Sequence, residues 1–140
     1  MPNPPGADVK LFTREEAEKT LPLVRVIVRD IVTDYDVYNR KSQELNAITA
    51  RMAARPTKED LKVQQELEDE VAALKKRIAE AALELEELGI ELKDCQLGLV
   101  DYPSKIGDDI GYLCWKFNED KIAFWHGLSE GYGSRKPLPK

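Results

Sequence analysis

The feature that most constrains this chain is a pair of apolar stripes with heptad spacing, one on each side of a single proline. One stripe runs through residues 21–52 and the other through residues 67–88, with apolar residues four and three apart. Such spacing keeps one face of a helix directed at a partner helix. Arg55-Pro56-Thr57 interrupts the pattern. Two helices joined by a short turn are therefore predicted.

The two stripes agree on one antiparallel register. In a helical hairpin the numbers of facing residues have a constant sum, and pairing Leu45 with Leu67, or Tyr38 with Leu74, gives 112 in both cases. Half of 112 is 56, the number of the turn proline. We therefore predict an antiparallel helical hairpin over residues 13–89, closed by Gly89 as a left-handed cap, with a coiled-coil arm at its far end.

The start of the first helix carries a capping signal and a proline. Thr13 and Glu16 have the spacing of a capping box. Pro22 would cost about 3 kcal/mol inside a helix. We therefore predict a short leading helix from Arg14 to about Thr20 and a long helix that starts afresh there. The proline-rich residues 1–12 are predicted to be a flexible lead.

After Gly89 the apolar period changes to that of β-strands. Four runs have aromatic and β-branched residues between turn residues: 90–93, 97–102, 110–117 and 122–128. They predict a small antiparallel β-meander of three or four strands over 90–130, with loops at 103–109 and 118–121 and a tail at 131–140. A sheet this small needs a cover, which the base of the hairpin supplies. The fold class is α+β, with one domain over 13–140.

Strand pairing assigns side chains to the two faces of this meander. Pairing the last two strands across residues 118–121 puts His126 on the apolar face that packs on the helices. Asp101, Cys114 and Trp125 then fall on the opposite face. A bulge or a slip of one residue would exchange these assignments.

Composition excludes several classes of function. The net charge of -5 argues against binding nucleic acid or an anionic membrane surface, and no apolar run approaches 18 residues. The first six residues lack the pattern of a signal peptide. The two cysteines are too few for a disulfide framework, which predicts reduced thiols and a cytoplasmic protein.

Residues suited to binding gather in the last third of the chain. It holds the sole histidine together with carboxylates, an arginine and aromatic side chains that could exclude water. The candidate ligand-binding residues are Asp101, Cys114, Trp115, His126, Glu130 and Arg135. Asp101, His126 and Glu130 are also candidate metal ligands, although no spacing matches a known metal pattern. The structural alternative is a hydrogen-bonded core histidine, cysteines that fill small apolar spaces, and tryptophans that anchor the core.

Several segments together resemble a known family. They are Phe12-Thr13, Leu21-Pro22, Gly98-Leu-Val-Asp-Tyr-Pro103, Leu113-Cys-Trp115, Trp125-His126 and Gly131-Tyr-Gly-Ser-Arg135. The chain resembles an uncharacterised bacterial family called domain of unknown function 2203, with Tyr102 where that family often has phenylalanine. The resemblance implies a family and no mechanism.

Two functions compete, and a third, nucleic-acid binding through the helical arm, is disfavoured because the second helix is acidic. The surplus apolar surface of Leu23, Val26 and Ile27 favours a cytoplasmic interaction module that forms a homodimer and uses its helical arm to bind a protein partner. The alternative is a small-ligand- or metal-binding protein, including an enzyme, with its site at the strand ends. No motif names a chemistry, so no catalytic residue is assigned, and a metal ion is the only cofactor considered.

Overall fold

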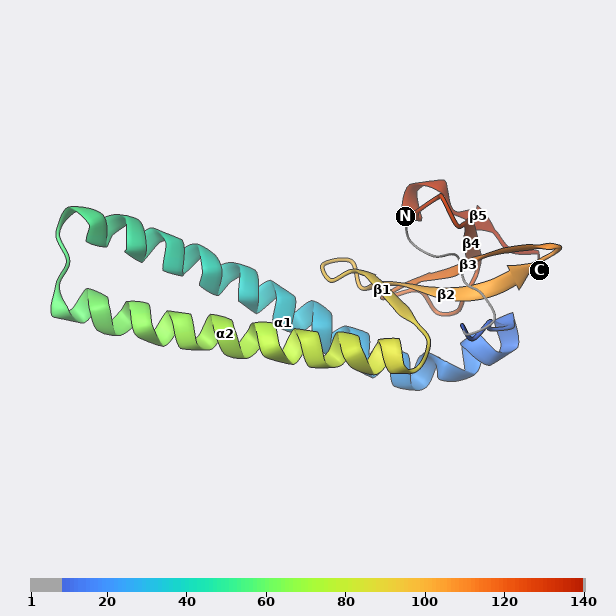
Figure 1. Cartoon of the computed structure of the whole chain (residues 1–140), viewed down its shortest axis with the longest axis horizontal. Coiled ribbons are helices and arrows are strands. Elements are labelled where there is room, and N and C mark those ends of the chain that lie inside the picture. The colour runs from blue at the N-terminus through green and yellow to red at the C-terminus, as the bar shows by residue number, and fades with distance from the viewer. Residues whose placement is uncertain (1–8, 140) are drawn as a thin grey trace.

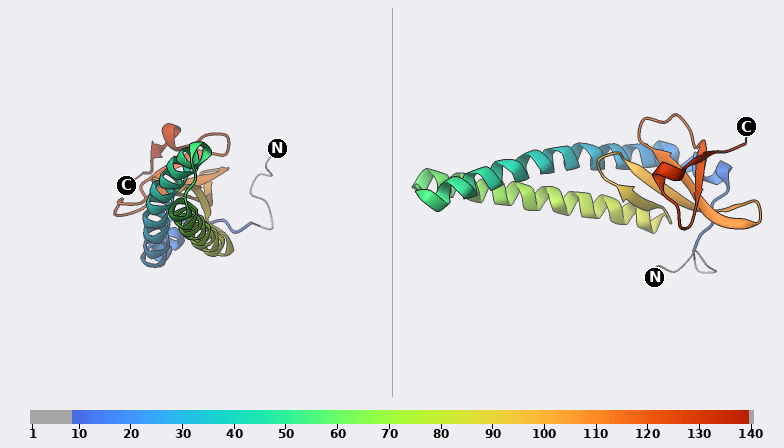
Figure 2. Two further views of the ribbon diagram at one scale, coloured as in Figure 1. Left: turned by 90° about the vertical axis from the view of Figure 1, so that its left-hand side faces the viewer. Right: turned by 90° about the horizontal axis from the view of Figure 1, so that it is seen from above.

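The computed structural model describes residues 9–139 and contains a long helical hairpin followed by a small sheet (Figure 1). The elements are α1 (Arg14–Ala54), α2 (Lys58–Glu87), β1 (Glu91–Asp94), β2 (Leu99–Ile106), β3 (Asp109–Lys116), β4 (Phe124–Gly127), the short 3-10 helix η1 (Tyr132–Ser134) and β5 (Lys136–Pro137). The hairpin projects from the sheet as an arm (Figure 2). The predicted α+β class, with the sheet at the base of the hairpin, is confirmed.

Contacts between the two helices agree with the predicted register. The Arg77 guanidinium donates to Asp34 Oδ1 at 2.6 Å, and Lys41 Nζ lies 3.1 Å from a Glu70 oxygen. The numbers of each pair sum to 111, within one of the predicted value. Asp34 is buried, but Arg77 is 63% exposed and the Lys41–Glu70 pair is partly exposed, so solvent screening keeps the contribution of each pair modest. The apolar seam, which includes the buried Leu74, therefore supplies most of the cohesion.

The first helix differs from the prediction at Pro22. The capping box at Thr13 is present, with Thr13 Oγ1 accepting the Glu16 N–H at 3.1 Å, but α1 then continues through Pro22 without a break. Figure 1 shows the first turns inclined to the rest of the helix, as expected where a proline removes a backbone donor. The leading turns stay attached because Ala17 and Leu21 are buried in the core.

The end of the second helix follows the prediction. Gly89 has a φ of +86°, a conformation that favours glycine, and the Ile90 N–H donates to the Leu85 carbonyl at 2.9 Å. This cap turns the chain into β1 and buries Ile90. The hairpin and the sheet therefore share one core.

The sheet is larger than predicted. Its five strands are antiparallel in the order β1-β2-β3-β4-β5, and the fifth strand comes from the predicted tail. The predicted loop at 103–109 is mostly strand, because β2 extends to Ile106 and β3 begins at Asp109. Pro103 fits there because β1 pairs with β2 only as far as Asp101, which leaves an edge that tolerates proline. The Pro103 carbonyl accepts the Phe12 N–H at 2.7 Å.

One face of the sheet packs on the helices. Val100, Tyr102, Leu113 and Trp115 are buried against α1 and α2 in one core cluster. Ile27 belongs to the same cluster, whereas Leu23 and Val26 are exposed. Of the three predicted interface residues, Ile27 is therefore part of the chain's own core.

The pairing of β3 with β4 is shifted by one residue from the prediction. His126 lies opposite Tyr112, and Cys114 lies opposite Phe124. The register differs because the connection between β3 and β4, residues 117–123, is longer than the predicted turn at 118–121. This connection is also hydrogen-bonded to α1. There Glu18 Oε1 accepts the Ile122 N–H at 3.0 Å. His126 and Phe124 therefore lie on the face away from the helices, and Trp125 packs against the core.

The segment before α1 is only partly described. The flexible lead predicted for 1–12 falls mainly outside the described residues, but Phe12 is buried and lies edge-on to the Tyr102 ring, with 5.1 Å between centroids. Phe12 thus belongs to the core rather than to a lead. Between residues 9 and 139, neither helix has a stretch long and apolar enough to cross a membrane.

Candidate functional site

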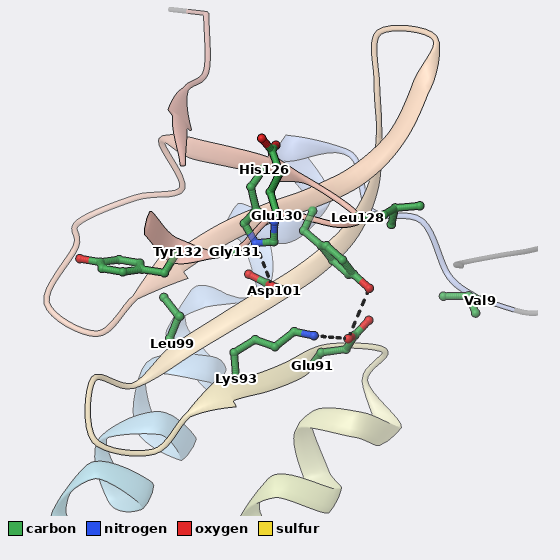
Figure 3. A pocket seen from close by; sticks show the side chains of 11 residues that line it. Val9, Glu91, Lys93, Leu99, Asp101, His126, Leu128, Glu130, Gly131 and Tyr132 are labelled. Atoms are coloured by element: carbon green, nitrogen blue, oxygen red, sulfur yellow. Dashed lines mark hydrogen bonds and ion pairs between the residues drawn. The ribbon is translucent and has the colours of Figure 1, made fainter. Parts of the chain in front are cut away.

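A pocket of about 300 Å³ lies on the sheet face that points away from the helices (Figure 3). Its polar lining comes from β1, β2, β3, β4 and the segment that follows β4, and apolar side chains close its sides. The lining residues are Val9, Glu91, Lys93, Leu99, Asp101, Tyr112, His126, Leu128, Glu130, Gly131 and Tyr132.

A buried Asp101–His126 pair forms the floor of the pocket. His126 Nε2 lies 2.9 Å from Asp101 Oδ2, and each side chain is no more than 3% exposed. The register explains this contact. Asp101 lies opposite Cys114, and His126 lies opposite Tyr112, two positions along β3 on the same face. Diagonal neighbours of this kind are within reach of long side chains.

The hydrogen bonds of His126 fix where its protons lie. Nδ1 is 2.9 Å from the Gly127 carbonyl oxygen, which can only accept, so Nδ1 carries a proton. Nε2 therefore faces Asp101 either as a bare lone pair or with a second proton. Two acceptors at 2.9 Å would repel each other, so one proton joins Nε2 and Oδ2. Burial raises the pKa of Asp101, and the nearby positive charges only partly offset this, which favours retention of that proton.

Asp101 also has an unsatisfied oxygen. Among the residues that the structure describes, Oδ1 has no hydrogen-bond partner although it is fully buried. Buried polar atoms without partners are rare, because each one loses its hydration without compensation. The Cys114 thiol is the other polar group that interacts with this carboxylate, so Asp101 lies between His126 and Cys114.

Cys114 completes a group of three potential metal ligands. Its sulfur, a carboxylate oxygen of Asp101 and a ring nitrogen of His126 all lie within 4.8 Å of one another. Burial and the negative charge of Asp101 raise the pKa of the Cys114 thiol to about 12, so the thiol is protonated at neutral pH. As it stands, Cys114 is a poor nucleophile.

A charged rim lies beside the floor. Lys93 Nζ is 2.8 Å from Glu91 Oε1 and 5.1 Å from the centroid of the Tyr112 ring. Partial burial lowers the pKa of Lys93, but its hydrogen bond and ion pair with Glu91 more than offset this, and the net shift is upward. The Tyr112 ring lies 5.4 Å from the His126 ring, so the rim and the floor are in contact.

The other candidate residues are distributed differently. Glu130 is on the pocket lip, where its Oε1 accepts the Gly127 N–H at 2.7 Å and the Lys136 ammonium at 3.0 Å. The hydrogen bond from Gly127 and the contact with Lys136 lower the pKa of Glu130. Glu130 is thus engaged with its own strand-end turn and is not part of the buried group of three potential ligands.

Arg135 and Trp115 lie outside the pocket lining. Arg135 pairs with Glu119 at 3.0 Å and stacks on the Phe124 ring at 4.1 Å. The guanidinium of Arg135 is therefore engaged by Glu119 and the Phe124 ring, and it is not directed into the pocket. Trp115 is fully buried on the opposite face, where its ring N–H donates to the Glu119 carbonyl.

Sequence reasoning missed part of the rim. Glu91 and Lys93 line the pocket, although neither is among the candidate residues from the sequence. The alternation of residues 90–93 was the available signal, because it puts both side chains on one face of a strand. The sequence does not show that Glu91 pairs with Asp101. This pairing brings the face of β1 that carries Glu91 and Lys93 to the pocket.

The fold and the pocket define an α+β protein in which a helical hairpin supports a five-stranded antiparallel sheet with a polar pocket on its outer face. The family model described as an uncharacterized conserved protein, DUF2203, matches residues 10–138. The chain belongs to this family, as the resemblance had indicated. Neither a search of curated proteins nor a search of solved structures found a match.

Proposed function

We propose that this chain is a cytoplasmic interaction module that forms a homodimer through the base of α1 and uses its coiled-coil arm to reach a protein partner. The observation that carries the dimer is an exposed apolar patch in the third and fourth turns of α1. Leu23 is 53% exposed and Val26 is 45% exposed, and they share one helix face with the exposed Pro22. The buried Ile27 lies on the neighbouring face and ties this part of the helix to the core.

Charge favours a second copy of the chain as the occupant of this patch. α1 carries seven acidic and seven basic side chains, so its formal charge is zero. α2 carries ten acidic and five basic side chains, a net of -5. A two-fold contact between the bases of two α1 helices keeps the acidic helices apart, whereas pairing through α2 would bring like charges together.

The arm supports the second half of the proposal. It projects from the sheet and makes no contribution to the pocket lining (Figure 1). Its seam is internally satisfied, with Leu67 and Leu74 buried, so its outer surfaces are free to contact another molecule. Protein binding fits this surface better than nucleic acid, because α2 is acidic. A cytoplasmic location fits the free thiols of Cys95 and Cys114.

Light scattering tests the dimer. The full chain at micromolar concentration should give twice the chain mass of 15.9 kDa. Val26→Asp should give the single-chain mass with an unchanged circular dichroism spectrum, and Ile27→Asp should unfold the chain because that side chain is only 6% exposed. The matched control is Leu61→Asp near the arm tip, where the leucine is 54% exposed. A wild-type chain that scatters as a monomer would refute the dimer.

A second candidate function is binding of a small polar molecule in the outer pocket. The observation that favours it is the combination of Lys93, Tyr112 and the buried pair around one cavity. Small carboxylic acids and amines can be added while amide NMR spectra are recorded. Shifts confined to residues of β1–β4, reduced by Tyr112→Phe, would support this function. Uniform small shifts over the whole chain would count against it.

A further inference from the structure

We infer that Asp101, Cys114 and His126 form a binding site for a zinc-like divalent metal ion. The inference stands apart from the dimer and from binding of an organic ligand. It begins from the chemical types of the three donors: a carboxylate oxygen, a sulfur and an imidazole nitrogen, all buried and all within 4.8 Å of one another. A set with sulfur and imidazole selects zinc and related transition metals over calcium and magnesium, which prefer oxygen ligands.

The hydrogen bond on the far side of His126 has the arrangement found around metal-bound histidines. Nδ1–H donates to the Gly127 carbonyl, so the ring is held in one orientation with Nε2 directed at Asp101. Metal-bound histidines usually donate their second ring N–H in this way, which fixes the tautomer that presents a lone pair to the metal. On the other side of the ring, Nε2 and Asp101 Oδ2 are both acceptors unless a cation lies between them. Either a proton or a metal ion can take that position.

The second oxygen of Asp101 is an independent sign of a ligand. Asp101 is 2% exposed, and its Oδ1 has no hydrogen-bond partner within residues 9–139. A metal ion on the pocket side of the carboxylate would compensate the buried charge of this group. Without a metal, the Cys114 thiol is the neighbouring donor that interacts with this carboxylate, and the ion would take the place of that thiol proton.

The distances are compatible with a tetrahedral ion after small side-chain movements. Zinc–ligand bonds of about 2.0–2.3 Å place pairs of donors roughly 3.3–3.6 Å apart. Nε2 and Oδ2 are now 2.9 Å apart, and no pair among the three donors exceeds 4.8 Å. Adjustments of about 1 Å therefore suffice. Asp101 and His126 line the pocket, so a fourth ligand position would be directed into the pocket, as in zinc sites with three protein ligands.

The charges balance on binding. The site without metal has an Asp101–His126 pair with one shared proton and a neutral Cys114 thiol, and its net charge is zero. Binding of M²⁺ releases the shared proton and the thiol proton, and the ion with one carboxylate, one thiolate and one neutral imidazole again has zero net charge. The guanidinium of Arg135 near Cys114 opposes a cation, but it is itself paired with Glu119 at 3.0 Å.

Cobalt titration tests the site, because Co²⁺ replaces zinc and a thiolate ligand gives it an intense charge-transfer absorption. Full-length protein treated with a chelator should bind one Co²⁺ per chain, with that absorption and with displacement by Zn²⁺. Cys114→Ser should abolish the charge-transfer absorption and weaken binding at least tenfold. Cys95→Ser is the matched control, because Cys95 packs against the hydrophobic core and is not one of the three donors, so this change should leave both quantities unchanged.

Two further measurements keep the test independent of folding defects. Circular dichroism should show that Cys114→Ser is folded. His126→Gln, like Cys114→Ser, should bind Co²⁺ only weakly. Zn²⁺ should raise the thermal midpoint of the wild type and of Cys95→Ser but not of Cys114→Ser, and Mg²⁺ should leave all three unchanged. Binding without charge-transfer absorption, absorption that survives in Cys114→Ser, or absence of stoichiometric binding would each overturn the site.

Discussion

Truncation of Leu74 offers a quantitative test of the arm. Leu74 is 8% exposed, lies in the middle of α2 and does not belong to the core cluster that the hairpin shares with the sheet. Removing its buried side chain loses about 1.5–3 kcal/mol of transfer free energy, and a residual cavity adds to this. We therefore expect Leu74→Ala to lower the free energy of unfolding by roughly 2–4 kcal/mol. The value should lie below that for Leu85→Ala in the closed core, because an arm two helices wide can collapse around the gap.

Urea denaturation followed by circular dichroism measures this difference. Leu61→Ala is the control, since Leu61 is 54% exposed and its truncation should change the free energy of unfolding by less than about 0.5 kcal/mol. The slope of the transition should stay constant across the variants, which shows that the arm and the sheet unfold together. A loss below about 0.5 kcal/mol for Leu74→Ala would mean that the seam contributes little, and the register argument would fail.

Four further predictions follow from the same structure. The double variant Leu45→Cys with Leu67→Cys should form a disulfide readily on oxidation, whereas Leu45→Cys with Leu74→Cys, which is out of register, should not. ¹⁵N NMR of the single histidine should show a protonated Nδ1 in the wild type. It should show a neutral ring of the same tautomer in Asp101→Asn, where the new amide donates to Nε2; a protonated Nε2 in that variant would contradict the assignment. Thr13→Ala should lower the free energy of unfolding by about 0.5–2 kcal/mol through loss of the cap. Hydrogen bonds from the backbone and side chain of Thr13 lower the pKa of Glu16. The ionised Glu16 side chain should therefore stabilise the fold at neutral pH, and this stabilisation should be lost as the pH falls through the acidic range. Glu16→Gln should remove this pH dependence.

The helical part of the fold was predictable because its signals repeat. Heptad spacing, a turn proline and a glycine cap specify the hairpin independently, and each agrees with the others. The continuation of α1 through Pro22 was not predictable from propensity, because the compensating contact is tertiary: the buried Leu21 holds the bend. Pro103 was misjudged for a similar reason, since its tolerance in β2 depends on where β1 ends.

The Asp101–His126 contact depends on the register between β3 and β4, and the sequence pattern does not determine that register. Phe124 and Trp125 are adjacent aromatics, so alternation does not decide which of them faces the core. Long-range contacts make that choice: Glu18 accepts the Ile122 N–H, and Arg25 donates to carbonyls of the same connection. The segment 117–123 is thereby tied to α1.

The same contacts bring His126 to Asp101 instead of directing it at the helices. The helix that forms the arm therefore also fixes the connection that aligns β4, and the pocket floor depends on the base of α1. A change at Glu18 or Arg25, although neither lines the pocket, should alter the Asp101–His126 contact before it alters the arm.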